Sequence, residues 1–165
     1  MTFPDDKTLA VLPASQPRRW AGISMLVCLG LLLIWTAYAA VGAVLWQAIF
    51  LVFGVLSLWA ADAMRRATEA VIQLTKTELR TDAGAVLARV EDVETVERGA
   101  FAFKPSQGFL VRLKTPGPRG WAPGLWWRAG TFLGVGGVVS GGQSRAMAEI
   151  LTALILERDG KIPGR

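Results

Sequence analysis

Residues 20–61 form one uninterrupted stretch without a charged side chain, and this stretch limits the possible folds more than any other feature. A membrane-spanning helix needs about 20 mainly apolar residues, so the stretch is roughly twice as long as one pass requires. It therefore predicts two membrane-spanning helices, at 20–38 and 41–61, joined by a very short turn. The small residues from Ala39 to Gly42 suit this turn, since glycine permits unusual backbone dihedral angles.

Aromatic and basic residues flank both predicted helices. Tryptophan and tyrosine concentrate at membrane interfaces, and arginine and lysine concentrate on the cytoplasmic side. The turn between the helices has no basic residue, so both termini are predicted to be cytoplasmic at a bacterial inner membrane. The alternative is that the tryptophans are ordinary apolar residues. The expected interface anchors are Arg18, Arg19, Trp20, Trp35, Tyr38, Trp46, Trp59, Arg65 and Arg66.

The segment before the first helix, residues 1–19, is polar, contains prolines and has no periodicity. Such a segment is expected to be a flexible N-terminal tail. A cleavable signal peptide is not expected, because the apolar stretch is too long and no short basic region precedes it.

The composition restricts the chemistry that the chain can perform. It contains no histidine, which excludes histidine-based catalytic triads and imidazole metal ligands. The single cysteine, Cys28, lies in the apolar stretch and cannot form an internal disulfide or a thiolate metal site. We therefore expect no metal ion and no cofactor. The net charge of +5 suits an anionic membrane surface.

Beyond Arg66 the pattern changes to short alternating runs separated by turn residues, which is typical of antiparallel sheet. Residues 100–114 are expected to form a hairpin, because Phe101 and Phe103 alternate in the same way as the following strand. Residues 90–99 are expected to be a helical turn or an irregular loop, and 115–124 a loop. The other expected strands are 69–75, 78–81 and 85–90, besides 108–114 within that hairpin. Strands 78–81 and 85–90 are expected to form a second hairpin around the turn residues 82–84.

The glycine- and tryptophan-rich segment 119–142 admits three interpretations. A third membrane helix is disfavoured by Pro123, by the glycines and by Arg128. A phosphate-binding loop is disfavoured because Val139 stands where the GxGxxG motif needs its third glycine. Bent strands remain the favoured interpretation, with alternate residues pointing to opposite faces. Leu125, Trp127 and Ala129 then share one face, and Trp126, Arg128 and Gly130 share the other.

A closing amphipathic helix is predicted at 143–157. Met147, Ile150, Leu151, Leu154 and Ile155 form one apolar stripe that could cover an open side of the sheet. Ser140 and Gln143 fit a capping box, and 159–165 is expected to be a tail.

The order of these elements resembles bacterial two-transmembrane-helix proteins with a pleckstrin-homology-like (PH-like) domain, and short uncharacterised inner-membrane proteins of alphaproteobacteria. The resemblance rests on 71–75, on ARVEDVETVERG, on FAFKPSQGFLVRLK, and on WWRAGTFLGVGG leading into SRAMAEILTALI. It implies an α+β membrane protein in which a transmembrane hairpin precedes a small curled antiparallel sheet or barrel, at 67–158, capped by the C-terminal helix.

The favoured function is a non-enzymatic accessory or binding protein of the inner membrane. Its cytoplasmic domain is expected to contact a membrane-protein partner, as a complex subunit or assembly factor, or anionic lipid. Nucleic acid is not expected, because the basic residues are scattered. The candidate contact residues are Lys104, Arg112, Lys114, Arg119, Trp121, Trp126 and Arg128; ordinary core and surface roles for them are the alternative.

The alternative function is a histidine-independent membrane enzyme that uses carboxylates. Its candidate acids are Glu91, Asp92, Glu94 and Glu97. They lie in a solvated acidic segment, and the sequence indicates no apolar pocket that could raise a carboxyl pKa.

Overall fold

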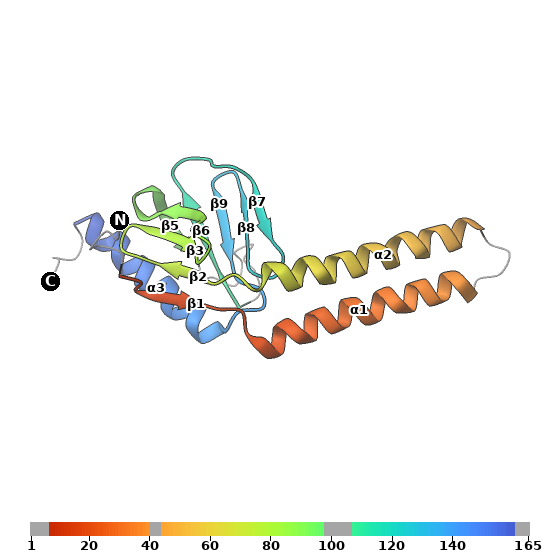
Figure 1. The fold of residues 1–165 in the computed structure, drawn as a ribbon. Coiled ribbons are helices and arrows are strands. Elements are labelled where there is room, and N and C mark those ends of the chain that lie inside the picture. The colour runs from red at the N-terminus through yellow and green to blue at the C-terminus, as the bar shows by residue number, and fades with distance from the viewer. Residues whose placement is uncertain (1–6, 40–43, 98–106, 161–165) are drawn as a thin grey trace.

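The computed structural model describes residues 7–39, 44–97 and 107–160. Two long helices project together from a domain of two antiparallel sheets and a C-terminal helix (Figure 1), so the chain is α+β, as predicted. The helices are α1 (Gln16–Ala39), α2 (Val44–Ala67) and α3 (Gly141–Arg158). The strands are β1 (Ala10–Leu12), β2 (Ile72–Leu74), β3 (Glu78–Thr81), β4 (Val86–Arg89), β5 (Val93–Glu97), β6 (Phe109–Leu113), β7 (Gly120–Ala122), β8 (Trp126–Ala129) and β9 (Phe132–Val135), with a 3-10 turn η1 (Val90–Asp92) before β5.

Helices α1 and α2 are each long and apolar enough to cross a membrane. Next to the sheet domain both continue beyond the predicted limits of 20–38 and 41–61: α1 begins at Gln16 and α2 ends at Ala67, because the polar residues that flank the apolar stretch remain helical. Only 17% and 11% of their most apolar windows are buried, unlike the core helices of a soluble protein. Most of the turn predicted at 39–42 lies outside the described residues, which leave out 40–43.

Small residues allow α1 and α2 to approach closely. The buried residues of α1 are Ile23, Gly30 and Ala37, which recur at heptad spacing. A side-chain carbon at Gly54 would lie 2.7 Å from Ile34 Cγ1 and 3.0 Å from the Gly30 carbonyl oxygen. Close packing of this kind is the main attraction between helices in lipid, where the hydrophobic effect contributes little.

The strands form two sheets, of four strands in the order β1-β2-β3-β4 and of five strands in the order β5-β6-β9-β8-β7. Every pairing between neighbouring strands is antiparallel. Both sheets and α3 enclose one hydrophobic core, whose largest fully buried side chain is Phe109. The α3 residues Met147, Leu151 and Ile155 are buried in this core, which confirms that the apolar stripe of the closing helix covers the sheets. We call β1 to β9 with α3 the sheet domain.

In the sequence, the hairpin lies between β1 and β2, which are neighbouring strands of the sheet domain. β1 ends three residues before α1, α2 ends four residues before β2, and β1 pairs with β2 through Leu12 and Ile72. Leu12 is fully buried in the core. The prediction of a flexible tail at 1–19 is therefore wrong from residue 10 onward, and the domain does not begin at 67. The short strand escaped prediction because its partner is distant in sequence and its three residues carry almost no periodic signal.

Three further predictions about the sheets need correction. Residues 90–99 were expected to be a turn or loop, yet only η1 is helical and β5 follows it, since β5 completes the edge of the five-stranded sheet. The expected loop 115–124 contains β7, which pairs with β8. Strand β6 pairs with β5 and β9, and the other half of the expected hairpin, with Phe101 and Phe103, lies outside the described residues.

Of the remaining local predictions, those of strands are confirmed and that of the helix cap is not. The hairpin of β3 and β4 is confirmed, as are the strands β8 and β9 in the glycine- and tryptophan-rich segment. The capping box is wrong: Ser140 precedes α3 in an extended conformation, but its side chain makes no capping hydrogen bond.

Candidate functional site

The five-stranded sheet has one face toward the core and one face away from it. Val111 of β6 pairs with Leu133 of β9, which pairs with Arg128 of β8, and the two apolar members of this row are fully buried. The next row along the strands must point the opposite way, because side chains alternate across a strand. That row brings Gly134 of β9 beside Trp127 of β8.

The outward rows carry aromatic side chains from three strands. Trp127 pairs with Trp121 of β7, which is 64% exposed, and Phe132 of β9, which is 41% exposed, lies between Arg112 and Ala129. Gly134 allows the Trp127 indole to lie flat on β9, since a side-chain carbon at residue 134 would collide with that ring. Large exposed apolar groups that are gathered on one face typically mark an interaction surface. We call Arg112, Trp121, Trp127, Ala129 and Phe132 the outer aromatic face.

Trp126 and Arg128 do not belong to this surface. The alternation from Trp126 to Ala129 is as predicted, but the group of Trp126 and Arg128 faces inward and Trp127 faces outward. Leu125 does not share the face of Trp127, because it precedes β8 and is buried in the core. Trp126 packs partly buried against the core, with its ring beside Gly120. The expectation that Trp126 and Arg128 form an exposed contact site is therefore wrong. Alternation along a strand separates the side chains into two faces, but it does not identify the buried face. The outward face is identified by the pairing of Trp127 with Gly134, which the sequence analysis did not find.

Arg128 joins the two sheets. Its Nη1 donates a hydrogen bond of 2.8 Å to the carbonyl oxygen of Leu87 on β4, and its Nε is buried without a hydrogen-bond partner. The guanidinium group thus lies in the seam between the five-stranded and four-stranded sheets, where it hydrogen-bonds a carbonyl group of β4.

The other predicted basic residues do not form one cluster. Arg112 makes an exposed ion pair with Glu94, at 3.2 Å, and Lys114 Nζ donates a hydrogen bond to the Glu91 carbonyl oxygen, at 3.0 Å. Arg119 is exposed just before β7, and Lys104 lies outside the described residues. Of the predicted contact residues that the structure describes, only Arg112 and Trp121 lie on the outer aromatic face.

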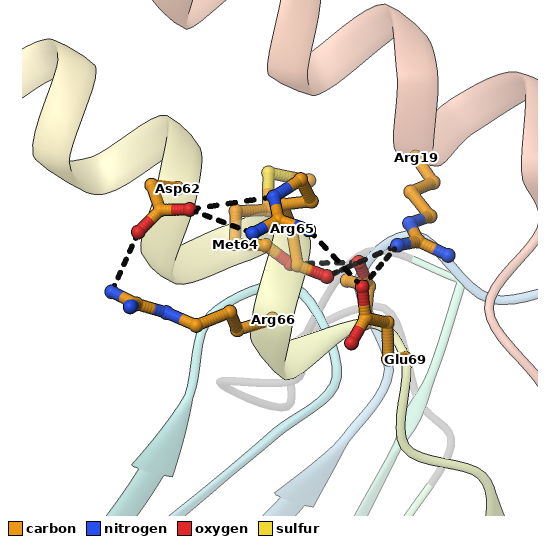
Figure 2. Close-up of polar contacts among 7 residues, drawn as sticks. Arg19, Asp62, Met64, Arg65, Arg66 and Glu69 are labelled. Carbon is orange, nitrogen blue, oxygen red and sulfur yellow. Dashed lines mark hydrogen bonds and ion pairs between the residues drawn. The ribbon is translucent and has the colours of Figure 1, made fainter.

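Charged residues form a network of ion pairs at the end of the hairpin that adjoins the sheet domain (Figure 2). We call this network the collar, and its members are Arg19, Asp62, Arg65, Arg66 and Glu69. Arg65 pairs with Asp62 at 3.1 Å and with Glu69 at 3.4 Å, and Arg66 pairs with Asp62 at 2.7 Å. Arg19 reaches across from α1 to the Glu69 carboxylate and to the Arg65 carbonyl oxygen. Because Asp62, Arg65, Arg66 and Glu69 are about half exposed, each ion pair among them contributes only about 0–1 kcal/mol of stability. The collar marks the level at which the apolar part of the hairpin ends.

The predicted aromatic anchors lie toward both ends of the hairpin and are all more than half exposed. Trp20 and Trp59 lie toward the collar, and Arg19 lies 5.9 Å above the Trp20 ring. Trp35, Tyr38 and Trp46 lie toward the opposite end. Arg18 instead donates a hydrogen bond to the Val139 carbonyl oxygen, at 3.2 Å, and so binds the hairpin to the sheet domain.

A groove of about 640 Å³ lies between β3, η1 and the end of α3. Its walls carry charges of both signs, several of which are already paired, such as Arg89 with Glu91 at 3.4 Å. Arg158 is held there by its hydrogen bonds to the carbonyl oxygens of Val90, Glu91 and Val93. Within residues 7–39, 44–97 and 107–160, no three histidine, cysteine or acidic side chains gather in a way that could hold a metal ion.

Comparison of the chain with protein-family models, with curated proteins and with solved structures finds no match. The candidate functional features of the chain are the sheet domain, the collar and the outer aromatic face.

Proposed function

We propose that the chain is a non-enzymatic accessory protein of a bacterial inner membrane, in which the transmembrane hairpin presents a PH-like sheet domain to a membrane-protein partner. The observation that carries the proposal is the outer aromatic face. It belongs to a domain whose paired strands β1 and β2 lead directly into and out of the hairpin. A surface held in this way has a fixed height above the bilayer, which suits recognition of another membrane protein.

Insertion of the hairpin into the membrane is supported by its exposed apolar surface. Side chains such as Leu31, Leu32 and Phe53 are 57–59% exposed, and in water this surface would be strongly unfavourable. Removal of α1 as a signal sequence would also remove β1, whose Leu12 is fully buried in the core. The arginines at the domain end favour a cytoplasmic location for that end, and so for both termini.

The PH-like assignment is part of the proposal. It is supported by two antiparallel sheets around a single core, with a C-terminal helix that packs on β1 and β5. A PH-like fold alone does not define a ligand, because the same fold can carry different binding sites. The outer aromatic face, and not the fold, therefore supports a partner for this chain.

A membrane-protein partner is favoured over anionic lipid as the ligand of the outer aromatic face. Trp127 and Phe132 provide flat apolar area on this face. The one arginine that belongs to the outer aromatic face, Arg112, is already paired with Glu94. Aromatic side chains and arginine are the residues most enriched in protein interfaces. A site for an anionic headgroup would need several unpaired cationic groups at one place.

The carboxylate enzyme is the less favoured function. Glu91 and Glu94 are exposed, and their carboxylates are paired with Arg89 and Arg112. A general acid or base needs a site that shields it from water and shifts its pKa, and these two side chains lie on the open surface.

The test compares two variants of the full chain in native membranes, Phe132→Glu on the outer aromatic face and Val86→Glu on β4. Both remove an exposed apolar side chain from a strand, since Phe132 is 41% and Val86 48% exposed. After gentle detergent extraction and native sizing, we expect the wild type and Val86→Glu to run as one larger complex and Phe132→Glu to run alone. A wild type that runs alone, or equal loss in both variants, contradicts the proposal.

A further inference from the structure

The β7 edge of the five-stranded sheet lies against the base of the hairpin. β7 is the last strand of that sheet, and Figure 1 shows it on the side nearest α2. The turn from β7 to β8 touches α2 directly, because a side-chain carbon at Gly124 would lie 3.3 Å from Met64 Cε and 3.5 Å from Thr68 Cγ2. Met64 lies within the charged collar, so the β7 edge lies at the level where the apolar part of the hairpin ends.

Hydrogen bonds hold this edge at a fixed place relative to α1. The Ser15 amide, just before α1, donates to the Val138 carbonyl oxygen over 2.6 Å. The Val138 amide in turn donates to the Gly124 carbonyl oxygen over 2.9 Å. A continuous backbone connection therefore runs from the start of α1 to the β7–β8 turn, and the edge cannot swing away from the hairpin without breaking it.

Trp121 stands on this edge, at the border of the outer aromatic face, whereas Trp127 and Phe132, which carry the proposed partner contact, lie on the inner strands β8 and β9. Trp121 is the most exposed aromatic side chain in the described part of the sheet domain, at 64%, and Arg119, two residues earlier, is also exposed. An indole ring is apolar with one N–H donor, a combination that favours the headgroup region of a bilayer. A nearby guanidinium group adds attraction to phosphate.

We infer that the β7 edge, through Trp121 and Arg119, contacts the phospholipid headgroups of the leaflet into which the collar end of the hairpin is inserted. The sheet domain then lies on the membrane and not at a distance from it. This contact supplements the anchors Trp20 and Trp59 on the helices with one that comes from the sheet. The inference rests on the proposed insertion of the hairpin, and its test is designed to separate the two.

The test measures the depth of single fluorescent labels in the full chain. Cys28→Ala removes the native cysteine, and single cysteines are then introduced as Trp121→Cys, Arg119→Cys, Trp20→Cys and Thr77→Cys. Each protein is labelled with the same environment-sensitive fluorophore and placed in nanodiscs of phosphatidylcholine and phosphatidylglycerol, with and without a headgroup spin label. Arg119→Cys keeps the Trp121 indole and Trp121→Cys keeps the Arg119 guanidinium group, so each labelled protein retains one of the two contact side chains.

Thr77 is the matched control in the sheet domain. It is exposed in the turn between β2 and β3, at the end of β2 opposite to its connection with α2. It lines the groove at the C-terminal end of α3, which Figure 1 shows on the side of the sheet domain away from the hairpin. We expect the spin label to quench the fluorophore at residues 119 and 121 as strongly as at residue 20, with no quenching at residue 77.

The outcomes distinguish the inference from the proposed function. Quenching at residue 20 without quenching at 119 and 121 overturns the inference and leaves insertion of the hairpin intact. No quenching at residue 20 shows that the hairpin is not inserted, and so overturns both. Equal quenching at 77, 119 and 121 overturns the inference, because it shows that the β7 edge has no preferred contact with the bilayer.

Discussion

The Arg128 guanidinium group donates a hydrogen bond to the Leu87 carbonyl oxygen over 2.8 Å, from β8 of one sheet to β4 of the other. This bond crosses the seam where no strand pairing joins the sheets. Arg128 was expected to belong to an exposed binding site, and its position makes it a structural residue instead. Its replacement should therefore change the stability of the sheet domain.

We expect Arg128→Ala to lower the free energy of unfolding by about 1.5–3 kcal/mol, because a half-buried carbonyl group loses a charged donor. Arg112→Ala is the matched control, since Arg112 makes only an exposed ion pair, and it should lower the same free energy by about 0.2–1 kcal/mol. Guanidinium denaturation of the full chain in detergent micelles measures both. Equal losses in the two variants would contradict a role for Arg128 in joining the sheets.

The N-terminal strand provides a second prediction. Leu12 is fully buried and Val11 is 47% exposed, although they are neighbours in β1. Leu12→Ala should lower the free energy of unfolding by about 2–5 kcal/mol, because it leaves a cavity in the core. Val11→Ala should change it by less than about 1 kcal/mol, since its side chain remains largely in water. The same denaturation experiment checks both, and a negligible effect of Leu12→Ala would mean that residues 10–12 are not part of the domain.

The hairpin and α3 could be predicted from the sequence because each repeats one signal over many residues. The absence of charge from 20 to 61 and the stripe that contains Met147 and Leu151 both extend over several helical turns. Strand β1 has only three residues, and its partner β2 lies beyond the whole hairpin. Its existence depends on tertiary pairing, which no local pattern records.

The candidate site shows the same division. The alternation in β8 correctly separated Trp126 and Arg128 from Trp127, because the period of a strand is a local property. Which group faces the core depends on β6 and β9, where Val111 and Leu133 lie in the same row as Arg128. The pairing of Gly134 with Trp127 could be recognised only once the register between β8 and β9 was known.

The contact between α1 and α2 gives a third prediction. A side-chain carbon at Gly54 would lie 2.7 Å from Ile34 Cγ1, and one turn later Ser57 Oγ donates to the Leu26 carbonyl oxygen over 2.8 Å. Gly54→Leu should force the helices apart and lower the free energy of hairpin unfolding by about 1–3 kcal/mol. Unfolding in mixed micelles with increasing sodium dodecyl sulfate measures this quantity.

Val55→Leu is the control for this substitution. Val55 adjoins Gly54 but is 54% exposed, so the added methylene should point toward lipid or detergent and change the free energy by less than about 0.5 kcal/mol. If Gly54→Leu were as stable as Val55→Leu, the two helices would not be packed through Gly54.

The C-terminal end of α3 gives the last prediction. Arg158 Nη1 donates to the carbonyl oxygens of Val90, Glu91 and Val93, at 2.8, 3.1 and 2.8 Å, and so fastens the end of α3 to the link between the two sheets. Arg158→Ala should lower the free energy of unfolding by about 1.5–3 kcal/mol, because these carbonyl groups lose a charged donor. Arg158→Lys should recover only part of the loss, since an ammonium group lacks the planar geometry of the guanidinium fork.

Arg145→Ala provides the comparison within the same helix. Arg145 is exposed in the first half of α3, and its removal should change the free energy of unfolding by less than about 0.5 kcal/mol. Hydrogen exchange adds a local measurement: amide protection in η1 and β5 should fall in Arg158→Ala and stay unchanged in Arg145→Ala, because only Arg158 contacts that link. Unchanged protection in both variants would show that the carbonyl groups of Val90 and Val93 are held by the sheets alone, without the helix.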